Sequence, residues 1–357
     1  MSSVMRGWLS LASGAALTAI TANPSLATER MFIPLGDANA VVIIDVADDT
    51  VVGRIENVPS AHGLAGTPDG RYLIAGSMAT RMPGAPPEKP VGVSEEEHKA
   101  HHDAVKPDDS KQEQKVSTVV ILRQQDGTVV RRIDVRGGVH HVATSPDSRL
   151  AVVTHPSANG ISVLDLESFT VKAELPTGPV ANYAVFTHDG SRLYVTNGGN
   201  GTVTELDTKT WKTRKIYRVG KNPEHAALAP NGHHLYVNNV VDGSMTAIYL
   251  PYEPKTQTYP VGRNPHGVDV SDDNSTIYMA AQDDDTLVAL NVRTRKRQTL
   301  SLAPAPYHLT VVRGKGKLYV SSAKEPKIWV VNQADLTVIR EIQIGGKGHQ
   351  MVQSPRS

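Results

Sequence analysis

The sequence predicts an all-β protein: a seven-bladed β-propeller made of four-stranded antiparallel blades. Three observations predict this fold. A unit of about 42 residues recurs along the chain, each unit holds four short runs of strand-forming residues, and no stretch shows sustained helical periodicity. Four strands within a repeat of this length are typical of one propeller blade.

The repeat is read from the residue that begins the innermost strand of each blade. These residues are His62, His141, Tyr183, His225, His266, His308 and His349. Their successive separations are 79, 42, 42, 41, 42 and 41 residues, so the first interval contains an insertion of about 37 residues. Turn sequences such as Pro-Asp-Gly at 68–70 divide the strands, and runs such as 193–196 are rich in β-branched and aromatic residues.

The two ends of the chain have different predicted roles. Residues 1–27 are typical of a secretory signal peptide, because one Arg precedes an apolar stretch at 8–20 and Ser25-Leu26-Ala27 ends in small residues. We therefore expect a periplasmic or secreted protein that does not insert into a membrane after cleavage. Residues 28–357 form the propeller domain. The strands predicted at 31–34, 41–46 and 51–55 share one blade with a strand at 349–353, which closes the ring.

The insertion, at about 78–116, is predicted to be a mobile loop. It opens with prolines, contains few apolar residues, and carries His98, His101 and His102. The spacing of these histidines would place two imidazoles on one helical face, as in a weak metal-capture site. By topology the loop should overhang the face that bears the strand-starting histidines, and His155 should lie near that rim. The alternative is a solvated loop with incidental histidines.

The strand-starting position is histidine in six of seven blades. Chance placement of 14 His among 357 residues would put about 0.3 at seven positions. Because innermost strands surround the propeller axis, His62, His141, His225, His266, His308 and His349 should form a ring at the channel mouth, completed by Tyr183. Such a ring suits a zinc or copper ion. The alternative is an inherited repeat histidine that only hydrogen-bonds the next blade.

Composition excludes several functions. Without cysteine the chain has no disulfide, thiolate metal site, c-type haem or cysteine nucleophile. A formal charge of +1 argues against a basic face for nucleic acid. The sequence contains no Gly-x-Ser-x-Gly nucleophile elbow.

The run Leu193-Tyr194-Val195-Thr196-Asn197 and the Pro-Asp-Gly turns resemble the YVTN-type, YncE-like seven-bladed propellers of bacteria. The resemblance covers the mature chain and implies fold more than function. In plan, a histidine-rich loop beside a propeller is similar to the periplasmic zinc-chaperone propellers, which deliver zinc to solute-binding proteins. That likeness implies a metal ion as ligand and a periplasmic metal-transport protein or metalloprotein as partner.

Three functions follow from these patterns. The main hypothesis is a periplasmic metal-binding propeller that captures an ion with its loop and ring for delivery or storage, without catalysis. The first alternative is a metal-dependent enzyme of the lactonase or lyase kind with its ion in the central channel. The second is a metal-free protein-interaction scaffold.

Overall fold

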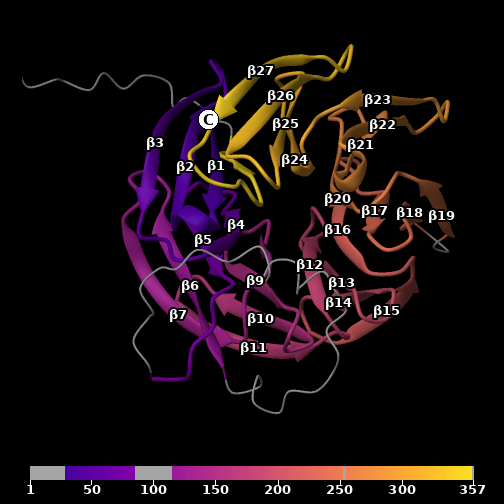
Figure 1. Cartoon of the computed structure of the whole chain (residues 1–357). Coiled ribbons are helices and arrows are strands. Elements are labelled where there is room, and N and C mark those ends of the chain that lie inside the picture. The colour runs from indigo at the N-terminus through magenta and orange to yellow at the C-terminus, as the bar shows by residue number, and fades with distance from the viewer. Residues whose placement is uncertain (1–28, 85–114, 252–254, 356–357) are drawn as a thin grey trace, which may run out of the picture.

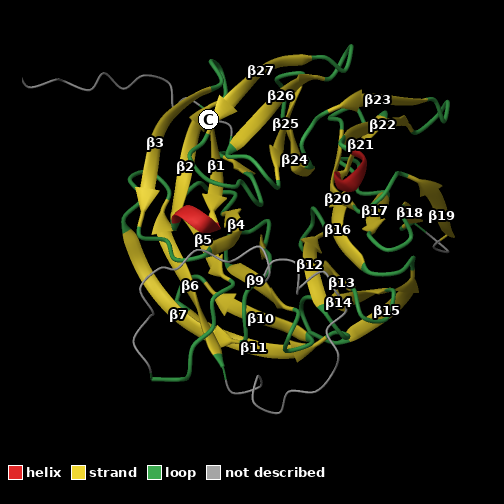
Figure 2. Cartoon of the chain, viewed as in Figure 1, coloured by secondary structure: helices red, strands yellow, loops and turns green. Residues whose placement is uncertain are grey.

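The computed structural model describes residues 29–84, 115–251 and 255–355. These residues form seven four-stranded antiparallel sheets arranged as blades around a common axis (Figures 1 and 2). The predicted seven-bladed propeller is therefore confirmed. Within the described part of the chain, no helix has the length and apolar character needed to cross a membrane.

The blades are numbered along the chain. Blade 1 contains β1 (Arg30–Leu35), β2 (Ala40–Asp45), β3 (Thr50–Glu56) and β28 (Val352–Gln353), and blade 2 contains β4 (Ala61–Gly66), β5 (Tyr72–Ser77), β6 (Val116–Arg123) and β7 (Val129–Arg136). Blade 3 contains β8 (Val142–Thr144), β9 (Leu150–His155), β10 (Gly160–Asp165) and β11 (Thr170–Pro176), and blade 4 contains β12 (Ala181–Phe186), β13 (Arg192–Asn197), β14 (Thr202–Asp207) and β15 (Thr213–Arg218).

The remaining blades follow the same plan. Blade 5 contains β16 (Pro223–Leu228), β17 (His234–Asn239), β18 (Ser244–Tyr249) and β19 (Lys255–Pro260), and blade 6 contains β20 (Pro265–Val270), β21 (Thr276–Ala281), β22 (Thr286–Asn291) and β23 (Arg297–Ser301). Blade 7 contains β24 (Pro306–Val312), β25 (Lys317–Ser322), β26 (Lys327–Asn332) and β27 (Val338–Gln343). Among the described residues, two single-turn 3₁₀ helices, η1 (Gly36–Ala38) and η3 (Gln282–Asp284), interrupt the strand pattern.

The core lies between blades. The middle strands are buried on both faces, as in β9 and β10, because each sheet packs against a neighbour on either side. The apolar clusters accordingly join adjacent blades; one packs Met31 and Ile44 of blade 1 against Tyr319 and Ile328 of blade 7. Outer strands such as β15 are mostly exposed.

The ring closes through blade 1, as predicted. There β1 pairs with β2 on one side and with β28 on the other, with Met31 opposite Gln353. The last blade and the first therefore lie side by side (Figure 1). A buried ion pair strengthens this junction: Lys317 of β25 binds Asp49 in the β2–β3 turn, and the Tyr319 hydroxyl donates to the same carboxylate.

Candidate functional site

The six histidines predicted to form a ring converge on the channel axis. Ring centroids are 4.0 Å apart for His225 and His266, 4.2 Å for His62 and His349, and 4.7 Å for His225 and His308. Their exposed fractions lie between 0% and 9%. The structure thus places them inside the channel, which corrects the expectation that they lie at its mouth.

A β-bulge at the start of five innermost strands contributes to this convergence. The pairing register shifts between Pro223 and Ala226 in blade 5, and blades 2, 4, 6 and 7 shift at the equivalent place. A bulge leaves residues unpaired and re-aims their side chains. In the bulged strands the histidine and, in several blades, the residue before it both turn into the channel.

Three further residues join these histidines: Glu224 and Tyr307 from bulged strands, and His140 from the segment just before β8. His140 stacks on His62 at 4.7 Å between centroids, and the Tyr307 ring lies 3.8 Å from that of His266. Glu224 is 1% exposed, with its Oε1 atom 3.4 Å from His266 Nε2. We call the full set the histidine cluster; it comprises His62, His140, His141, His225, His266, His308, His349 and Glu224.

Glycine allows the innermost strands to approach closely within this cluster. A Cβ atom on Gly267 would lie only 2.6 Å from both the Tyr307 oxygen and the Leu309 nitrogen. A Cβ on Gly63 would lie 2.8 Å from the His140 oxygen. The residue after the histidine therefore has to be small in blades 2 and 6, so that the imidazoles of neighbouring blades meet.

Backbone carbonyl groups orient the imidazoles. His62 Nδ1 lies 3.0 Å from the His140 oxygen, and His141 Nδ1 lies 3.0 Å from the Asn182 oxygen. Because a carbonyl oxygen can only accept, each Nδ1 atom donates, which leaves the Nε2 lone pair available in the neutral ring. The Nε2 atoms of His141 and His225 are 3.0 Å apart. The hydrogen bonds from Nδ1 to backbone carbonyl oxygens are those that metal-ligating histidines commonly make.

Burial keeps the central imidazoles neutral. Loss of solvation lowers the pKa of His141 and His308 well below the ordinary value, and the neighbouring His225 adds to the effect. Burial likewise raises the pKa of the Tyr183 hydroxyl, so this phenol stays protonated. Neutral imidazole is the form that binds metal ions.

Several groups in the cluster have the spacing of metal ligands. Four sets of three residues among the described ones bring one ligand atom each to within 4.8 Å of the others: His62–His308–His349, His62–His140–His141, His141–His225–His308 and Glu224–His225–His266. Tetrahedral zinc with nitrogen ligands near 2.0 Å needs separations of about 3.3 Å, so small side-chain movements complete any one site.

A pocket of about 490 Å³ opens above the cluster. His225, His308 and Tyr183 line its floor, whereas Pro68 and Pro146, from turns that follow innermost strands, line its rim. Access to the histidines therefore runs from the turn end of the channel.

The insertion departs from the other end of the channel. Ser77, the last residue of β5, pairs with Ala61 at the start of β4. This is the end at which the strand-starting histidines lie, because Ala61 directly precedes His62, so the insertion leaves β5 on the histidine side, as the topology predicts. That the loop overhangs this end of the channel stays a prediction, since residues 85–114 lie outside the described part of the chain. The predicted loop ligands His98, His101 and His102 lie outside the described residues.

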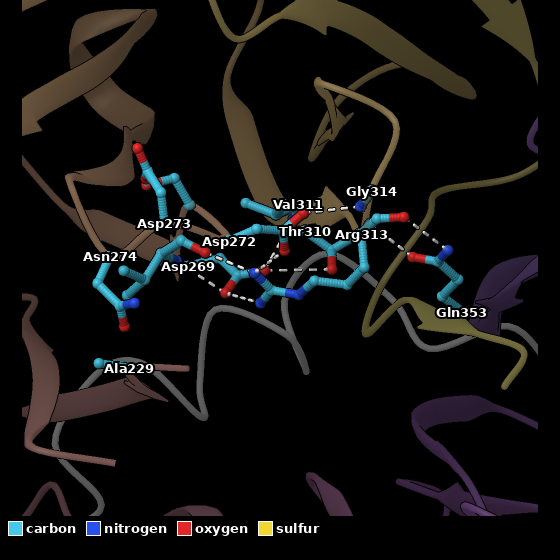
Figure 3. Close-up of polar contacts among 12 residues, drawn as sticks. Ala229, Asp269, Asp272, Asp273, Asn274, Thr310, Val311, Arg313, Gly314 and Gln353 are labelled. Atoms are coloured by element: carbon cyan, nitrogen blue, oxygen red, sulfur yellow. Dashed lines mark hydrogen bonds and ion pairs between the residues drawn. The ribbon is translucent and has the colours of Figure 1, made fainter. Parts of the chain in front are cut away.

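A carboxylate–guanidinium network joins Asp269, Asp272 and Arg313 (Figure 3), and Asp269 and Arg313 form part of the pocket wall. Asp269 of β20 and Arg313, which follows β24, both line the pocket, with Arg313 Nη2 donating to Asp269 Oδ1 at 2.5 Å. Arg313 also binds Asp272 and the Val270 oxygen, and the other Asp269 oxygen accepts the Val311 N–H at 2.8 Å. These contacts fix the wall between blades 6 and 7.

His155 does not join the histidine cluster. It is 2% exposed within blade 3, with Nδ1 3.1 Å from the Gly138 oxygen and Nε2 2.8 Å from Ser162 Oγ. Both ring nitrogens are therefore occupied by protein groups. The expectation of a metal ligand at the rim is corrected, because the end of β9 is covered by neighbouring backbone.

His155 also makes stability depend on pH. Burial lowers its pKa to about 4, against an ordinary value of 6.5. Below pH 6.5 the unfolded chain binds this proton and the native protein does not, so stability falls as the pH drops from 6.5 towards 4, by about 3 kcal/mol in all. The free energy of unfolding, measured in urea at several pH values across this range, should fall less steeply with decreasing pH for His155→Gln than for the parent protein. The exposed-site variant His233→Gln should keep the parental slope; equal slopes for all three proteins would contradict the assignment.

The family described as "Lactonase, 7-bladed beta-propeller" matches residues 98–313, more than half of the chain. The protein belongs to this family. The match agrees with a YVTN-like propeller, whereas the narrower YncE-like assignment stays an expectation.

Solved structures share the fold of this lactonase-family propeller at low identity. Periplasmic gluconolactonase PpgL of Pseudomonas aeruginosa is 13% identical, with 93% of this chain and 100% of that chain covered and a TM-score of 0.68. A putative 6-phosphogluconolactonase of Bacteroides fragilis is 12% identical, with coverages of 93% and 99% and a TM-score of 0.71. Hydrazine synthase of Kuenenia stuttgartiensis is 15% identical, with coverages of 85% and 92% and a TM-score of 0.68. No curated protein matches the chain.

Family membership changes the balance between the functional hypotheses. It favours the enzymatic alternative over metal delivery. In this lactonase-family propeller, each residue missed from the sequence directly precedes a strand-starting histidine. The doublet His140-His141 and the acid directly before His225 were the available signals.

Proposed function

We propose that this protein is a metal-dependent lactone hydrolase that acts in the channel pocket. One observation carries the proposal: His225 and His308 belong both to the histidine cluster and to the pocket lining. A zinc or copper ion held by these imidazoles would therefore border the space in which a lactone ring sits.

The bound ion would supply Lewis acidity and a water molecule that ionises near neutral pH. The protein's own residues position the metal ligands and the substrate. His141 lies against His225 and would hold its orientation, while the protonated Tyr183 hydroxyl can donate a hydrogen bond to a lactone oxygen. Side chains such as Val185 and Leu228 line the walls and exclude bulk water from the reacting ester.

The burial of the histidine cluster favours lactone hydrolysis over metal delivery. A donor site must release its ion to a partner, and the cluster histidines are at most 9% exposed. The same burial suits an ion that remains in place while substrates enter through the pocket. The signal-peptide pattern of residues 1–27 supports a periplasmic or secreted location for this reaction.

The test is lactone hydrolysis by zinc-loaded and copper-loaded protein, followed by acid release at constant pH. The panel contains D-glucono-δ-lactone, its 6-phosphate and γ-butyrolactone. We expect saturable turnover of at least one of them, lowered about tenfold or more by Tyr183→Phe, which removes one transition-state hydrogen bond. His155→Gln serves as the buried-histidine control and should retain activity. Rates equal to buffer for every lactone and both ions would refute the proposal.

A further inference from the structure

The histidine cluster contains more ligands than one ion uses. It gathers seven imidazoles and one carboxylate, all buried, whereas a catalytic zinc ion takes three protein ligands. The surplus raises the question of how many ions the cluster is built to hold.

We propose that the cluster binds two metal ions side by side. One lies on Glu224, His225 and His266, and the other on His62, His308 and His349. These two sets share no residue, so both can be filled at once. This inference goes beyond the proposed hydrolysis and does not depend on it.

The alternative is a single central ion. The set His141–His225–His308 takes one histidine from each of the two other sites. An ion there would therefore prevent either outer site from being completed. One central ion and two outer ions are thus mutually exclusive arrangements, which a count of bound ions distinguishes.

The two proposed sites are adjacent. The ring of His308 lies 4.7 Å from that of His225 and 4.9 Å from that of His266, centroid to centroid. Ions in two-metal hydrolytic sites are about 3.5–4 Å apart. Each proposed site also contributes one histidine to the pocket floor, His225 from the first and His308 from the second. Both ions would therefore border the same substrate space.

A buried nitrogen atom without a hydrogen-bond partner supports an ion at the second site. His308 Nε2 is buried and has no hydrogen-bond partner among the described residues, and its side chain is 4% exposed. A buried polar atom without a partner destabilises the folded protein, and coordination of an ion would offset that cost. The first site has its own advantage, because the Glu224 carboxylate supplies a negative charge.

The histidines outside both sites have supporting positions. His141 Nε2 lies 3.0 Å from His225 Nε2, and His140 Nε2 lies 3.7 Å from Glu224 Oε1. His140 also stacks on His62, so it contacts a ligand of each proposed site. Both histidines can orient the ligands that they contact, as supporting side chains do at metal centres. The nitrogen and oxygen donors suit zinc and copper(II).

The experiment is zinc titration of metal-free full-length protein, with bound metal counted by elemental analysis after gel filtration. We expect two Zn²⁺ per chain in the parent protein and in the control His155→Gln. Glu224→Gln and His62→Ala should each bind one. One ion in the parent protein, or either single variant binding none or two, would overturn the inference.

Copper(II) provides a second readout. Two copper(II) ions about 4 Å apart couple magnetically. The fully loaded parent protein should therefore give a far weaker EPR signal than the same amount of isolated copper(II). Glu224→Gln should give the full signal of one isolated ion. If a variant fails to fold by circular dichroism, His266→Asn and His349→Gln replace the pair. Lactone hydrolysis with one bound zinc would overturn the two-ion inference alone, whereas two bound ions without hydrolysis would overturn the function alone.

Discussion

Replacing His225 and His308 together by alanine should lower kcat/KM for lactone hydrolysis by at least about a thousandfold. These are the two cluster residues at the pocket floor, so their loss removes the ligands between the ion and the substrate. A metal ion contributes several kcal/mol of transition-state stabilisation, and each 1.4 kcal/mol is a factor of about ten in rate.

The expected result has a clear control. Removing the metal from the parent protein with a chelator should reproduce the loss of lactone hydrolysis. Added Zn²⁺ or Cu²⁺ should then restore activity to the parent protein but not to the double variant. Circular dichroism should show an intact β-propeller, because the apolar clusters lie between blades and away from the axis. A double variant that retains both its metal and its turnover would remove the cluster from the mechanism.

Replacing Asp49 by alanine should lower the free energy of unfolding by about 3–5 kcal/mol. Lys317 and Asp49 are only 8% and 9% exposed, and Lys317 also donates to the Val46 oxygen at 2.7 Å. Without the carboxylate, the Lys317 ammonium would remain buried and lose its charge partner, which is the costly way to break a buried pair. The Tyr319 hydroxyl would lose the same acceptor.

Urea unfolding measures this effect against Asp48→Ala, a change at the exposed neighbouring aspartate. That control should stay within about 0.5 kcal/mol of the parent protein. The double variant Asp49→Ala/Lys317→Met should recover part of the loss, because it no longer buries an unpaired charge. Equal stabilities for Asp49→Ala and Asp48→Ala would mean that this junction between blades 7 and 1 does not depend on the ion pair.

The sequence by itself determined the number of blades and the closure of the ring. Strand order within a blade follows from local turns, and the repeat interval carries the blade count, so neither needs knowledge of distant contacts. The convergence of His62, His141, His225, His266, His308 and His349 was predicted for the same reason, since equal positions in equal repeats lie at equal heights. The terminal strand is shorter than predicted, β28 being confined to Val352–Gln353.

Only the tertiary structure decided what surrounds those histidines. In a regular strand successive side chains point to opposite faces, which would turn Glu224 and Tyr307 away from the axis. The β-bulges that bring them towards the axis lie where the innermost strands of the seven blades come together. The Asp269–Arg313 wall joins residues from two blades, and the pocket opens at the turn end. Each depends on how whole blades pack against one another, which a repeat of about 42 residues does not encode locally.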